Sequence, residues 1–412
     1  MKHTLIALTA SALLLTACHK SEPVEPETIA RTVLVYVAGD NNLSGSDGGP
    51  NYFKLDVKQM MEGSLHLSTN QKLILFVDCY RGHPYFLQVE NGDTLRLKTI
   101  EKEMKSSDPE TLLQAMRYVT DNFAADSYGL VLWGHADGWI TRSGGGPRRA
   151  YGMDDTGGRT WMNIPDMAQA LSSLPRLKFI FADCCAFLCV ENVYELRQAA
   201  DYIIGSPAEI PGEGAPYHSV VPAMFGSDDD FYKEMVDAYF AQEAQGWKVP
   251  LAVVKSSEMD QLAQATATTL ATIALDIEPD ADGCRYPDVE GLIFYFDHTQ
   301  YDMQDFMLRH ASAGQYAEWK KAFDKAVPYH TFAPVWVANH VLYKSNGEEF
   351  ADFTPTTERM GSIGMFVPQR ERDAVWWDSR YLINLGTTMT ELNSNIKSMQ
   401  WYAAARLADL GW

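Results

Sequence analysis

The sequence predicts an α/β protein with a mostly parallel β-sheet sandwiched by helices and an additional C-terminal α/β region. Short apolar, β-branched runs alternate with stretches of helical apolar spacing through the first half of the chain, which is typical of parallel sheets. These runs lack alternating polar residues, as expected for strands that are buried on both faces. The 412 residues provide ample length for a large core and contain no strict repeats,.

Strands are predicted where such runs are bounded by polar or glycine-rich segments. In the first half they are Thr32–Ala38, Lys72–Asp78, Tyr128–Trp133, Leu177–Ala182 and Asp201–Gly205. A hairpin is predicted around Asn91-Gly92, because this dipeptide suits the positive φ angles of a tight two-residue turn.

Helices are predicted from apolar spacing and from terminal signals. Asp108-Pro109-Glu110 combines an N-cap, a proline at the first helical position and an acid in the first turn, so a helix should run from there to about Phe123. The other helices predicted in the first half are Tyr52–Met61, Ile164–Leu174 and Phe187–Ala200.

The second half has a less regular pattern. Strands are predicted at Pro250–Val254, Gly291–Phe296 and Met360–Pro368, and helices near 228–244, 257–275, 315–326 and 394–409. We therefore predict a core over residues 31–220 and a C-terminal extension over residues 221–412 that packs on it,.

The N-terminus has the features of an export signal. A basic start at Lys2 precedes an apolar run, Leu5–Leu15, and small residues lead directly into Cys18,. This arrangement resembles a bacterial lipobox, which implies a lipoprotein signal peptide over residues 1–17 and acylation of Cys18; an ordinary signal peptide is the alternative. The Pro- and Glu-rich segment 18–30 reads as a tether,. We expect a protein lipid-anchored to the bacterial cell envelope, at the outer membrane or cell surface.

The net charge of the chain limits the classes of partner that it can bind. The net charge is −20 at pH 7, which argues against nucleic-acid binding because that function needs a basic surface. The same acidity is compatible with basic peptide substrates.

Three cysteines lie close together in FADCCAFLCVENVYEL, residues 181–196. Adjacent Cys184 and Cys185 point apart, so they are poor ligands for one metal ion, and only Cys185 with Cys189 has ligand spacing. A disulfide to Cys79 is the next alternative, but an odd number of cysteines remains once Cys18 is assigned to lipid, the fifth being Cys284,. We expect Cys184 and Cys189 to be packing residues.

Polar residues follow the predicted strands at Gly134-His135, Asp183-Cys184-Cys185 and Ser206-Pro207. The carboxyl ends of parallel strands meet at one edge, where sites form. We expect Cys185 to lie directly before a helix, whose dipole favours a thiolate. His135 is placed to supply a base, so a Cys/His acyl-transfer dyad is predicted.

These residues resemble the clostripain family of cysteine peptidases, of the same clan as caspases, legumains and gingipains. Gly134-His135-x-x-Gly138-Trp139 is similar to its histidine motif, and Asp183-x-Cys185 with the downstream Glu191 and Tyr194-Glu195-Leu196 is similar to its nucleophile motif. Further similar segments are Gly39–Leu43, Asp201–Tyr202, Ser206–Tyr217 and Gly361–Pro368. The resemblance covers residues 32–412 and is strongest over 128–217.

The resemblance implies a caspase-like core and cleavage of peptides or proteins after Arg or Lys. Cys185 takes the role of nucleophile and His135 that of catalytic histidine. The backbone N–H groups of Ala136 and Cys185 are the expected oxyanion donors, and Ala136 stands where relatives usually have Gly. Asp183 matches the acid that lines the pocket for the basic side chain, and Glu213 lies where relatives carry a second pocket acid.

Related enzymes imply self-cleavage in the loop after the histidine. Here that loop contains Gly146-Pro147-Arg148-Arg149-Ala150, so cleavage is expected after Arg149 or Arg148. No organic cofactor is expected. Some relatives use calcium, for which the acidic loops Asp40–Asp47 and Asp154-Asp155 are the candidates,.

Two other functions remain open from the sequence. A peptidase fold could be retained without catalysis as a surface lipoprotein that binds peptides or glycans, with aromatics such as Trp376-Trp377 at the surface. A cysteine amidase or transpeptidase could also be built on the same dyad.

Overall fold

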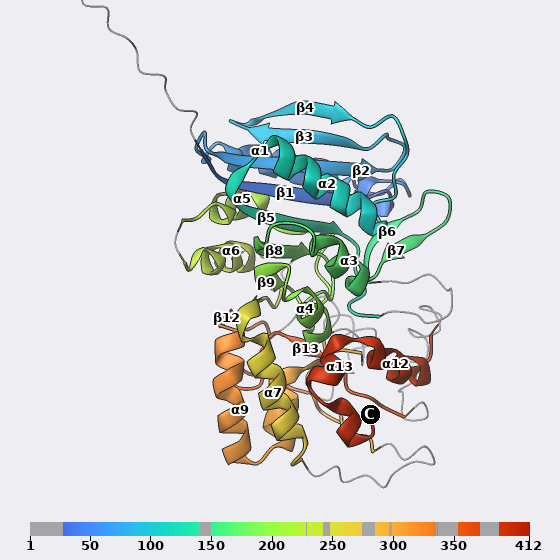
Figure 1. Ribbon diagram of the computed structural model, residues 1–412, viewed down its shortest axis with the longest axis vertical. Helices are drawn as coiled ribbons and strands as arrows, with labels where there is room; N and C mark the ends of the chain where they lie inside the picture. The colour runs from blue at the N-terminus through green and yellow to red at the C-terminus, as the bar shows by residue number, and fades with distance from the viewer. Residues whose placement is uncertain are drawn as a thin grey trace, which may run out of the picture.

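The computed structural model describes residues 28–140, 150–227, 229–241, 248–273, 285–295, 299–334, 336, 353–370 and 387–412. Within these ranges, no helix combines the length and apolar character needed to cross a membrane. Figure 1 shows a large sheet at one end of the molecule and a group of helices, including α7, α9, α12 and α13, at the other.

A nine-stranded sheet forms the centre of the molecule, in the order β12-β10-β9-β8-β5-β1-β2-β3-β4. Its five middle strands are parallel to one another, which confirms the predicted fold class. These strands are β1 (Ile29–Gly39), β2 (Gln71–Cys79), β5 (Ala125–Gly134), β8 (Leu177–Asp183) and β9 (Ala200–Gly205). Each contains one of the five apolar runs, or most of one, that predicted a strand.

The predicted hairpin forms one edge of the sheet. β3 (Tyr85–Glu90) and β4 (Asp93–Thr99) are antiparallel, and their turn residues Asn91 and Gly92 have φ angles of 52° and 76°. Positive φ at both central residues is the geometry for which Asn-Gly is favoured.

Helices cover both faces of the sheet (Figure 1). Alternate residues of β1 enter two separate apolar clusters, Val33, Val35 and Val37 in one and Leu34, Tyr36 and Ala38 in the other, because side chains along a strand alternate between faces. The first cluster includes α1 (Tyr52–Ser64), α5 (Tyr217–Met224) and α6 (Phe231–Phe240). The second includes α2 (Pro109–Asn122), α3 (Ile164–Leu171), α4 (Val190–Leu196) and α7 (Met259–Leu270).

The C-terminal half continues the same sheet. β10 (Ala252–Lys255) pairs antiparallel with β9, and β12 (Tyr329–His330) pairs with β10. The second apolar cluster extends as far as Trp412. Residue 220 therefore does not separate two sheets or two cores.

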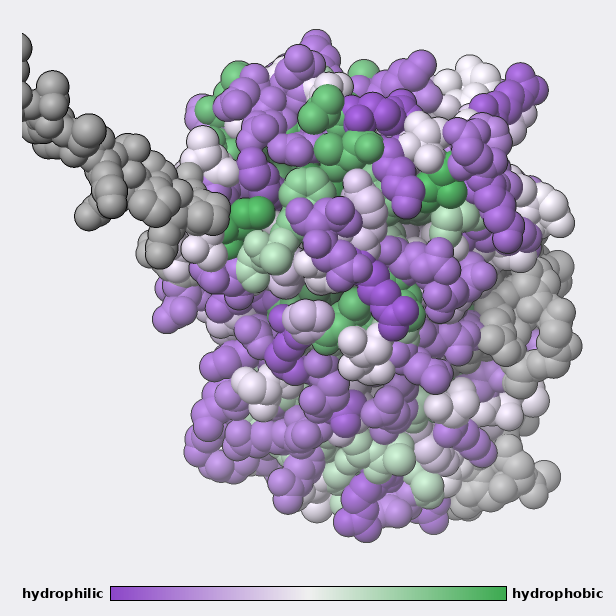
Figure 2. Space-filling model, turned by 45° about the horizontal axis from the view of Figure 1, so that its top comes forward, coloured by the Kyte–Doolittle hydropathy of each residue, from purple (hydrophilic) through white to green (hydrophobic). Residues whose placement is uncertain are grey.

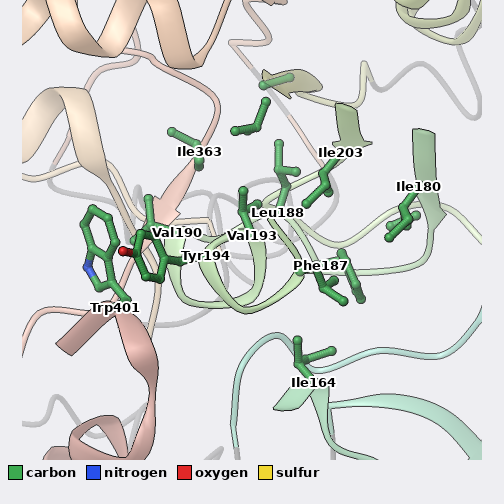
Figure 3. Close-up of a cluster of buried hydrophobic side chains, with 14 of the residues drawn as sticks. Ile164, Ile180, Phe187, Leu188, Val190, Val193, Tyr194, Ile203, Ile363 and Trp401 are labelled. Atoms are coloured by element: carbon green, nitrogen blue, oxygen red, sulfur yellow. The ribbon is translucent and has the colours of Figure 1, made fainter. Parts of the chain in front are cut away.

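The remaining C-terminal elements lie beyond this edge. They are β11 (Tyr301–Asp302), α8 (Met303–His310), α9 (Ala313–Ala326), β13 (Gly364–Met365), α12 (Met389–Asn395) and α13 (Gln400–Ala404). β11 and β13 form a separate two-stranded sheet. Figure 3 shows Ile363 and Trp401 from this half gathered with side chains of α4 in one buried cluster.

Several boundary predictions were wrong. The helix predicted at Phe187–Ala200 is limited to α4, because Phe187 and Leu188 lie in an irregular loop whose backbone bonds to the segment after β9. Only Gly364–Met365 of the strand predicted at Met360–Pro368 is extended and paired. The helix predicted near 394–409 is broken, with φ of 54° at Arg406. At Gly291–Phe296 the described residues make an isolated bridge, Phe294 to Tyr301.

The molecular surface is mainly hydrophilic in the view of Figure 2, with apolar residues scattered among polar ones. In the described chain the large exposed apolar residues are few and separate in sequence: Leu55, Leu65, Tyr80, Leu95 and Leu308. This surface agrees with the acidic composition.

Candidate active site

Two adjacent parallel strands bring His135 and Cys185 to the same pocket. Trp133 of β5 lies opposite Asp183 of β8 in the sheet register, so the residues two positions further along each strand leave the sheet at the same edge. The pocket there has a volume of about 280 Å³. Its lining residues are Asn42, Leu43, Tyr52, Trp133, Gly134, His135, Asp183, Cys185, Ile210, Pro211, Gly212 and Gly214.

The backbone around His135 is held by a short strand that the sequence did not predict. β6 (Tyr151–Asp154), which pairs with β7 (Thr160–Met162), also lies beside the histidine loop. Gly152 N–H donates to the His135 carbonyl at 2.9 Å, and Asp137 N–H donates to the Ala150 carbonyl at 3.2 Å. Ala136 lies opposite Tyr151 between these two bonds, so its own N–H is not used in this pairing.

Alanine is compatible with position 136. The positive φ angles of the histidine loop fall at Gly134 (150°) and Gly138 (75°), and Ala136 is not among the described residues with positive φ. The glycine that relatives usually have there is therefore not needed for backbone geometry in this chain.

Asn42 holds the imidazole ring of His135. It lies in a 3-10 turn, η1 (Asn42–Ser44), directly after β1, and its Oδ1 is 2.8 Å from His135 Nε2. An amide oxygen only accepts hydrogen bonds, so Nε2–H is the donor and the neutral ring keeps its basic lone pair on Nδ1. Sequence reasoning marked the segment Gly39–Leu43 but gave Asn42 no role.

Burial keeps His135 uncharged. The pKa of His135 is lowered to about 4, first by desolvation and then by the positive charge of Arg159, against a smaller opposing effect of Asp155. The imidazole is therefore neutral at pH 7 and can accept a proton.

Cys185 is also uncharged in the resting enzyme. Burial raises the pKa of its thiol to about 12, with a further contribution from Glu209, while the backbone N–H of Ile210 opposes the shift. That N–H lies 3.5 Å from Cys185 Sγ. The expectation that a helix dipole favours the thiolate was wrong, because α4 begins only at Val190, with Cys189 as its N-cap.

The other cysteines are packing residues or lie apart from the pocket. Cys184 and Cys189 are buried in apolar clusters, as predicted. Cys79, Cys184, Cys185 and Cys189 are all free thiols, so no disulfide joins the nucleophile loop to Cys79. Cys18 and Cys284 lie outside the described residues.

Asp183 forms part of the pocket wall, and its carboxylate is held by three donors. The backbone N–H of Ala215 donates at 3.0 Å, the hydroxyl of Tyr217 at 2.7 Å and that of Tyr239 at 3.3 Å. Burial raises the pKa of Asp183, and these hydrogen bonds oppose the rise. A Cβ on Gly214 would lie 2.8 Å from Asp183 Oδ2, so glycine is required there.

A second carboxyl group, Asp56 of α1, lies behind the pocket. Its Oδ2 accepts from the indole N–H of Trp133 at 2.7 Å, and Trp133 lines the pocket. The pKa of Asp56 is raised to about 8, mainly by burial and with contributions from the negative charges of Asp183 and Glu213, against the hydrogen bond from Trp133. Glu213 does not line the pocket but lies between Gly212 and Gly214, which do. Asp56 was not found from the sequence, because α1 is remote from both motifs along the chain.

The acidic loops that were considered for calcium bind other groups. The side chain of Asp40 accepts from the hydroxyl of Thr156, and Asp154 accepts from the backbone N–H of Ser106 at 2.8 Å. Throughout the described ranges, no three or more acidic, histidine or cysteine side chains are grouped so that they could hold a metal ion.

Some predicted residues cannot be placed. Arg148 and Arg149, the expected cleavage residues, and Trp376-Trp377, the expected surface aromatics, lie outside the described ranges. The neighbouring Ile140 and Ala150 are described, and both are buried.

Known proteins share this fold and sequence pattern. A secreted C11 cysteine protease from Bacteroides thetaiotaomicron, solved with an irreversible peptide inhibitor, superposes with a TM-score of 0.70 at 26% identity and covers 92% of this chain and 99% of its own. An inactive zymogen C11 protease from Parabacteroides distasonis gives 0.69 at 27% identity, with 93% and 99% covered.

The curated relative is more distant. Clostripain from Hathewaya histolytica is 24% identical over 222 residues, which cover 46% of this chain and 41% of clostripain, so the match spans less than half of that protein. The clostripain family as a whole matches residues 35–401. Since that match includes both predicted motifs and most of the chain, this protein belongs to the clostripain family.

Proposed function

We propose that this protein is a cysteine endopeptidase that cleaves after Arg or Lys, with Cys185 as nucleophile and His135 as proton shuttle. The observation that carries the proposal is that both residues line one pocket whose wall includes the buried carboxylate of Asp183. Of two solved relatives with similar coverage, one is a C11 cysteine protease that holds a peptide inhibitor and the other is an inactive zymogen C11 protease.

The charge of the pocket supports a basic side chain at the cleavage site. The negative charges of Asp183 and Glu213 are close enough to raise the pKa of Asp56, and the main influences on Asp56 and Asp183 include no lysine or arginine of the described chain. A guanidinium or ammonium group entering the pocket would supply the missing positive charge and lower the pKa of Asp56 and Asp183.

The proposed first step transfers one proton and forms one bond. As Cys185 Sγ attacks the carbonyl carbon after the basic residue, its proton moves to the unprotonated nitrogen of His135. The negative charge that develops on the carbonyl oxygen is stabilised by the N–H groups of Ala136 and Cys185. Cys185 and His135 are both uncharged at the start, so the buried site does not hold an ion pair before substrate binds.

The second step releases the amine. The C–N bond breaks while His135 passes its proton to the leaving nitrogen, and a thioester remains on Cys185. Water then attacks the thioester carbonyl with His135 accepting its proton, the acid leaves, and the thiol is regenerated by that proton.

The experiment is a turnover assay of the purified protein on fluorogenic peptides that differ only at the residue before the scissile bond. Arg and Lys substrates should be cleaved, and a citrulline substrate, a neutral isostere of Arg, should lose roughly 10- to 100-fold in kcat/KM because a charge-assisted hydrogen bond is lost. Cys185→Ala should abolish turnover, and Cys184→Ala is the matched control. Equal cleavage by Cys185→Ala and wild type would contradict the proposal.

We also propose that the protein cuts itself after Arg149 or Arg148. Both ends of the loop, Ile140 and Ala150, are anchored in the core, and Ala150 bonds to the histidine loop, so a cut there would change the surroundings of His135. A related solved structure is described as an inactive zymogen. Intact-mass analysis should show fragments in wild type and a single mass in Cys185→Ala; identical fragments in both would rule out self-cleavage.

Export is proposed on the N-terminal signal, with lipid attachment at Cys18. A solved relative is described as secreted. Partition of the native protein into a detergent phase, lost in Cys18→Ser, is the expected result, whereas unchanged partition would contradict lipid attachment.

A further inference from the structure

We propose that Gln300, contributed by the C-terminal half, is a positioning residue that fixes the backbone on both sides of the catalytic dyad. The proposal rests on the proposed function in one respect, the assignment of Cys185 as nucleophile. The observation behind it is a direct contact between Gln300 and the two catalytic loops. No motif of the sequence indicated this contact.

The backbone directly after Cys185 has an unfavourable conformation. Ala186 has a φ of 53°, a left-handed geometry that residues with a Cβ rarely adopt. Non-glycine residues keep this conformation only where surrounding contacts hold them. The orientation of the Cys185–Ala186 peptide, and with it the direction of the nucleophile, therefore depends on those contacts.

Two hydrogen bonds hold Ala186 from opposite sides. Its N–H donates to the carbonyl of Ala208 at 2.9 Å, and its carbonyl accepts from the side-chain Nε2 of Gln300 at 2.8 Å. Gln300 is fully buried, so water does not compete for this bond. Removing the donor would leave a buried carbonyl without this partner and release one of the two restraints.

The same carboxamide touches the histidine loop. A Cβ built on Gly138 would lie 2.2 Å from Gln300 Nε2 and 3.3 Å from the Ala186 carbonyl oxygen. Gly138 has a φ of 75°, so the glycine is needed both for its backbone angle and for this close approach. Gln300 thus lies between the loop that carries His135 and the loop that carries Cys185.

The C-terminal half holds Gln300 in place. The Gln300 carbonyl accepts from Tyr295 N–H at 2.8 Å, and the next residue, Tyr301, pairs with Met365 in the small sheet of β11 and β13. From that sheet, Gly364 N–H donates to the Leu188 carbonyl in the nucleophile loop at 3.0 Å. Figure 3 shows Leu188 in the same buried cluster as Ile363, which precedes Gly364.

These contacts give the C-terminal half a role in catalysis that differs from general stability. The carboxamide of Gln300 fixes the relative position of the two catalytic loops. Removing its N–H donor should therefore alter the chemical step more than the binding of substrate. A residue of this kind touches neither substrate nor reacting atoms, and acts through Ala186 and Gly138.

The test is the pH dependence of Gln300→Glu. A protonated glutamic acid donates a hydrogen bond to the Ala186 carbonyl, whereas its carboxylate cannot. Burial raises the pKa of a carboxyl group, so the glutamic acid should lose its proton between pH 5 and pH 8.5. The ratio of variant to wild-type kcat should therefore be near one at pH 5 and fall at least about tenfold by pH 8.5. KM should stay within about threefold of the wild-type value. Gln300→Met, similar in volume but without a donor, should be about tenfold slower in kcat at every pH.

Gln304 provides a matched control. It is also buried and its Nε2 also donates to a backbone carbonyl, that of Glu358, at 2.7 Å, but that carbonyl belongs to neither catalytic loop. Gln304→Glu introduces the same chemistry without contact to the dyad. Two results would overturn the proposal. One is that the kcat ratios of Gln300→Glu and Gln304→Glu to wild type change with pH in the same way. The other is that Gln300→Met has the wild-type kcat.

A second readout separates this inference from the proposed function. The rate of Cys185 alkylation by iodoacetamide, followed by mass spectrometry, needs no peptidase activity. The Gln300→Glu to wild-type rate ratio should change at least about threefold between pH 5 and pH 8.5, since reactivity depends on the surroundings of the thiol. Absence of turnover in wild type would contradict the peptidase, whereas a constant alkylation ratio in a cleaving enzyme would contradict only the role of Gln300.

Discussion

At the scale of single residues, the two side chains of the proposed dyad are both uncharged. Burial lowers the pKa of His135 to about 4 and raises that of Cys185 to about 12. A neutral thiol beside a neutral imidazole carries one proton that can move, and the proposed mechanism uses that proton first in attack and then in release of the amine. On the acid side, protonation of His135 should therefore lower kcat only as the pH approaches 4.

Asn42 provides a test of this ring assignment. Asn42→Ala removes the acceptor of His135 Nε2–H, so kcat should fall roughly 10- to 100-fold through loss of ring orientation. Asn42→Asp places a carboxylate beside the ring, which favours the imidazolium and raises the pKa of His135. The acid limb of kcat should then move to higher pH than in wild type.

The control is Asn122→Ala, a change on the exposed end of α2, which should leave both kcat and the pH profile unaltered. An acid limb that stays in place in Asn42→Asp would contradict the contact between Asn42 and His135. The pH profile is the deciding measurement, since a merely structural defect would lower activity at all pH values.

That His135, Asp183 and Cys185 share one pocket was predictable from the sequence, whereas the residues around them were not. His135 and Cys185 follow buried strands and Asp183 ends one, positions that an apolar run marks in the sequence. Asn42 and Asp56 reach the site from η1 and α1 through contacts in space. Their roles depend on the order of strands in the sheet, which local sequence patterns do not determine.

At the scale of elements, strands were easier to predict than the segments that leave them. An apolar run buried on both faces has a clear sequence signature. Phe187 and Leu188, by contrast, are buried in an irregular loop, and their spacing resembles the start of a helix. β6 and β7 are short, and their pairing with one another and with the histidine loop fixes them more than their composition does.

Two acidic side chains, one near the end of β2 and one at the end of β6, lie close together. This pair should make the free energy of unfolding depend on pH. Ser106 N–H donates to Asp78 at 3.1 Å and to Asp154 at 2.8 Å. Burial, followed by the charge of Asp154, raises the pKa of Asp78 from 3.8 to about 8. In the unfolded chain Asp78 loses its proton near pH 4, whereas the folded protein keeps it, so stability is lost as pH rises between these values, by about 1.4 kcal/mol per pH unit.

Asp78→Asn should remove this dependence. The free energy of unfolding is measured by urea titration at pH 5 and pH 7.5. Between these two pH values, the wild-type value should fall by about 3 kcal/mol relative to the variant value. Asp121→Asn, on the exposed surface of α2, is the control and should follow wild type at both pH values. A difference between Asp78→Asn and wild type that is the same at pH 5 and pH 7.5 would show that Asp78 is not protonated in the folded state.

At the scale of the whole molecule, the sheet and the core continue past the boundary suggested by the sequence. β10 and β12 complete one edge, and the apolar cluster beneath them includes residues from both halves. The weaker pattern after residue 220 has a physical cause, because short strands and broken helices are held there by long-range contacts. The contact of Gln300 with both catalytic loops is the most consequential of these, and sequence alone gave no sign of it.

The measurement that tests the account most directly is the site of covalent labelling by a peptide with Arg before an electrophilic ketone. We expect the purified protein to take up one equivalent, on Cys185 alone, as identified by peptide mass spectrometry. Labelling should be lost in Cys185→Ala and should be slowed by competing Arg substrate. A label on Cys184, on Cys79 or on no cysteine at all, in protein that cleaves Arg peptides, would contradict the assignment of Cys185 as the nucleophile.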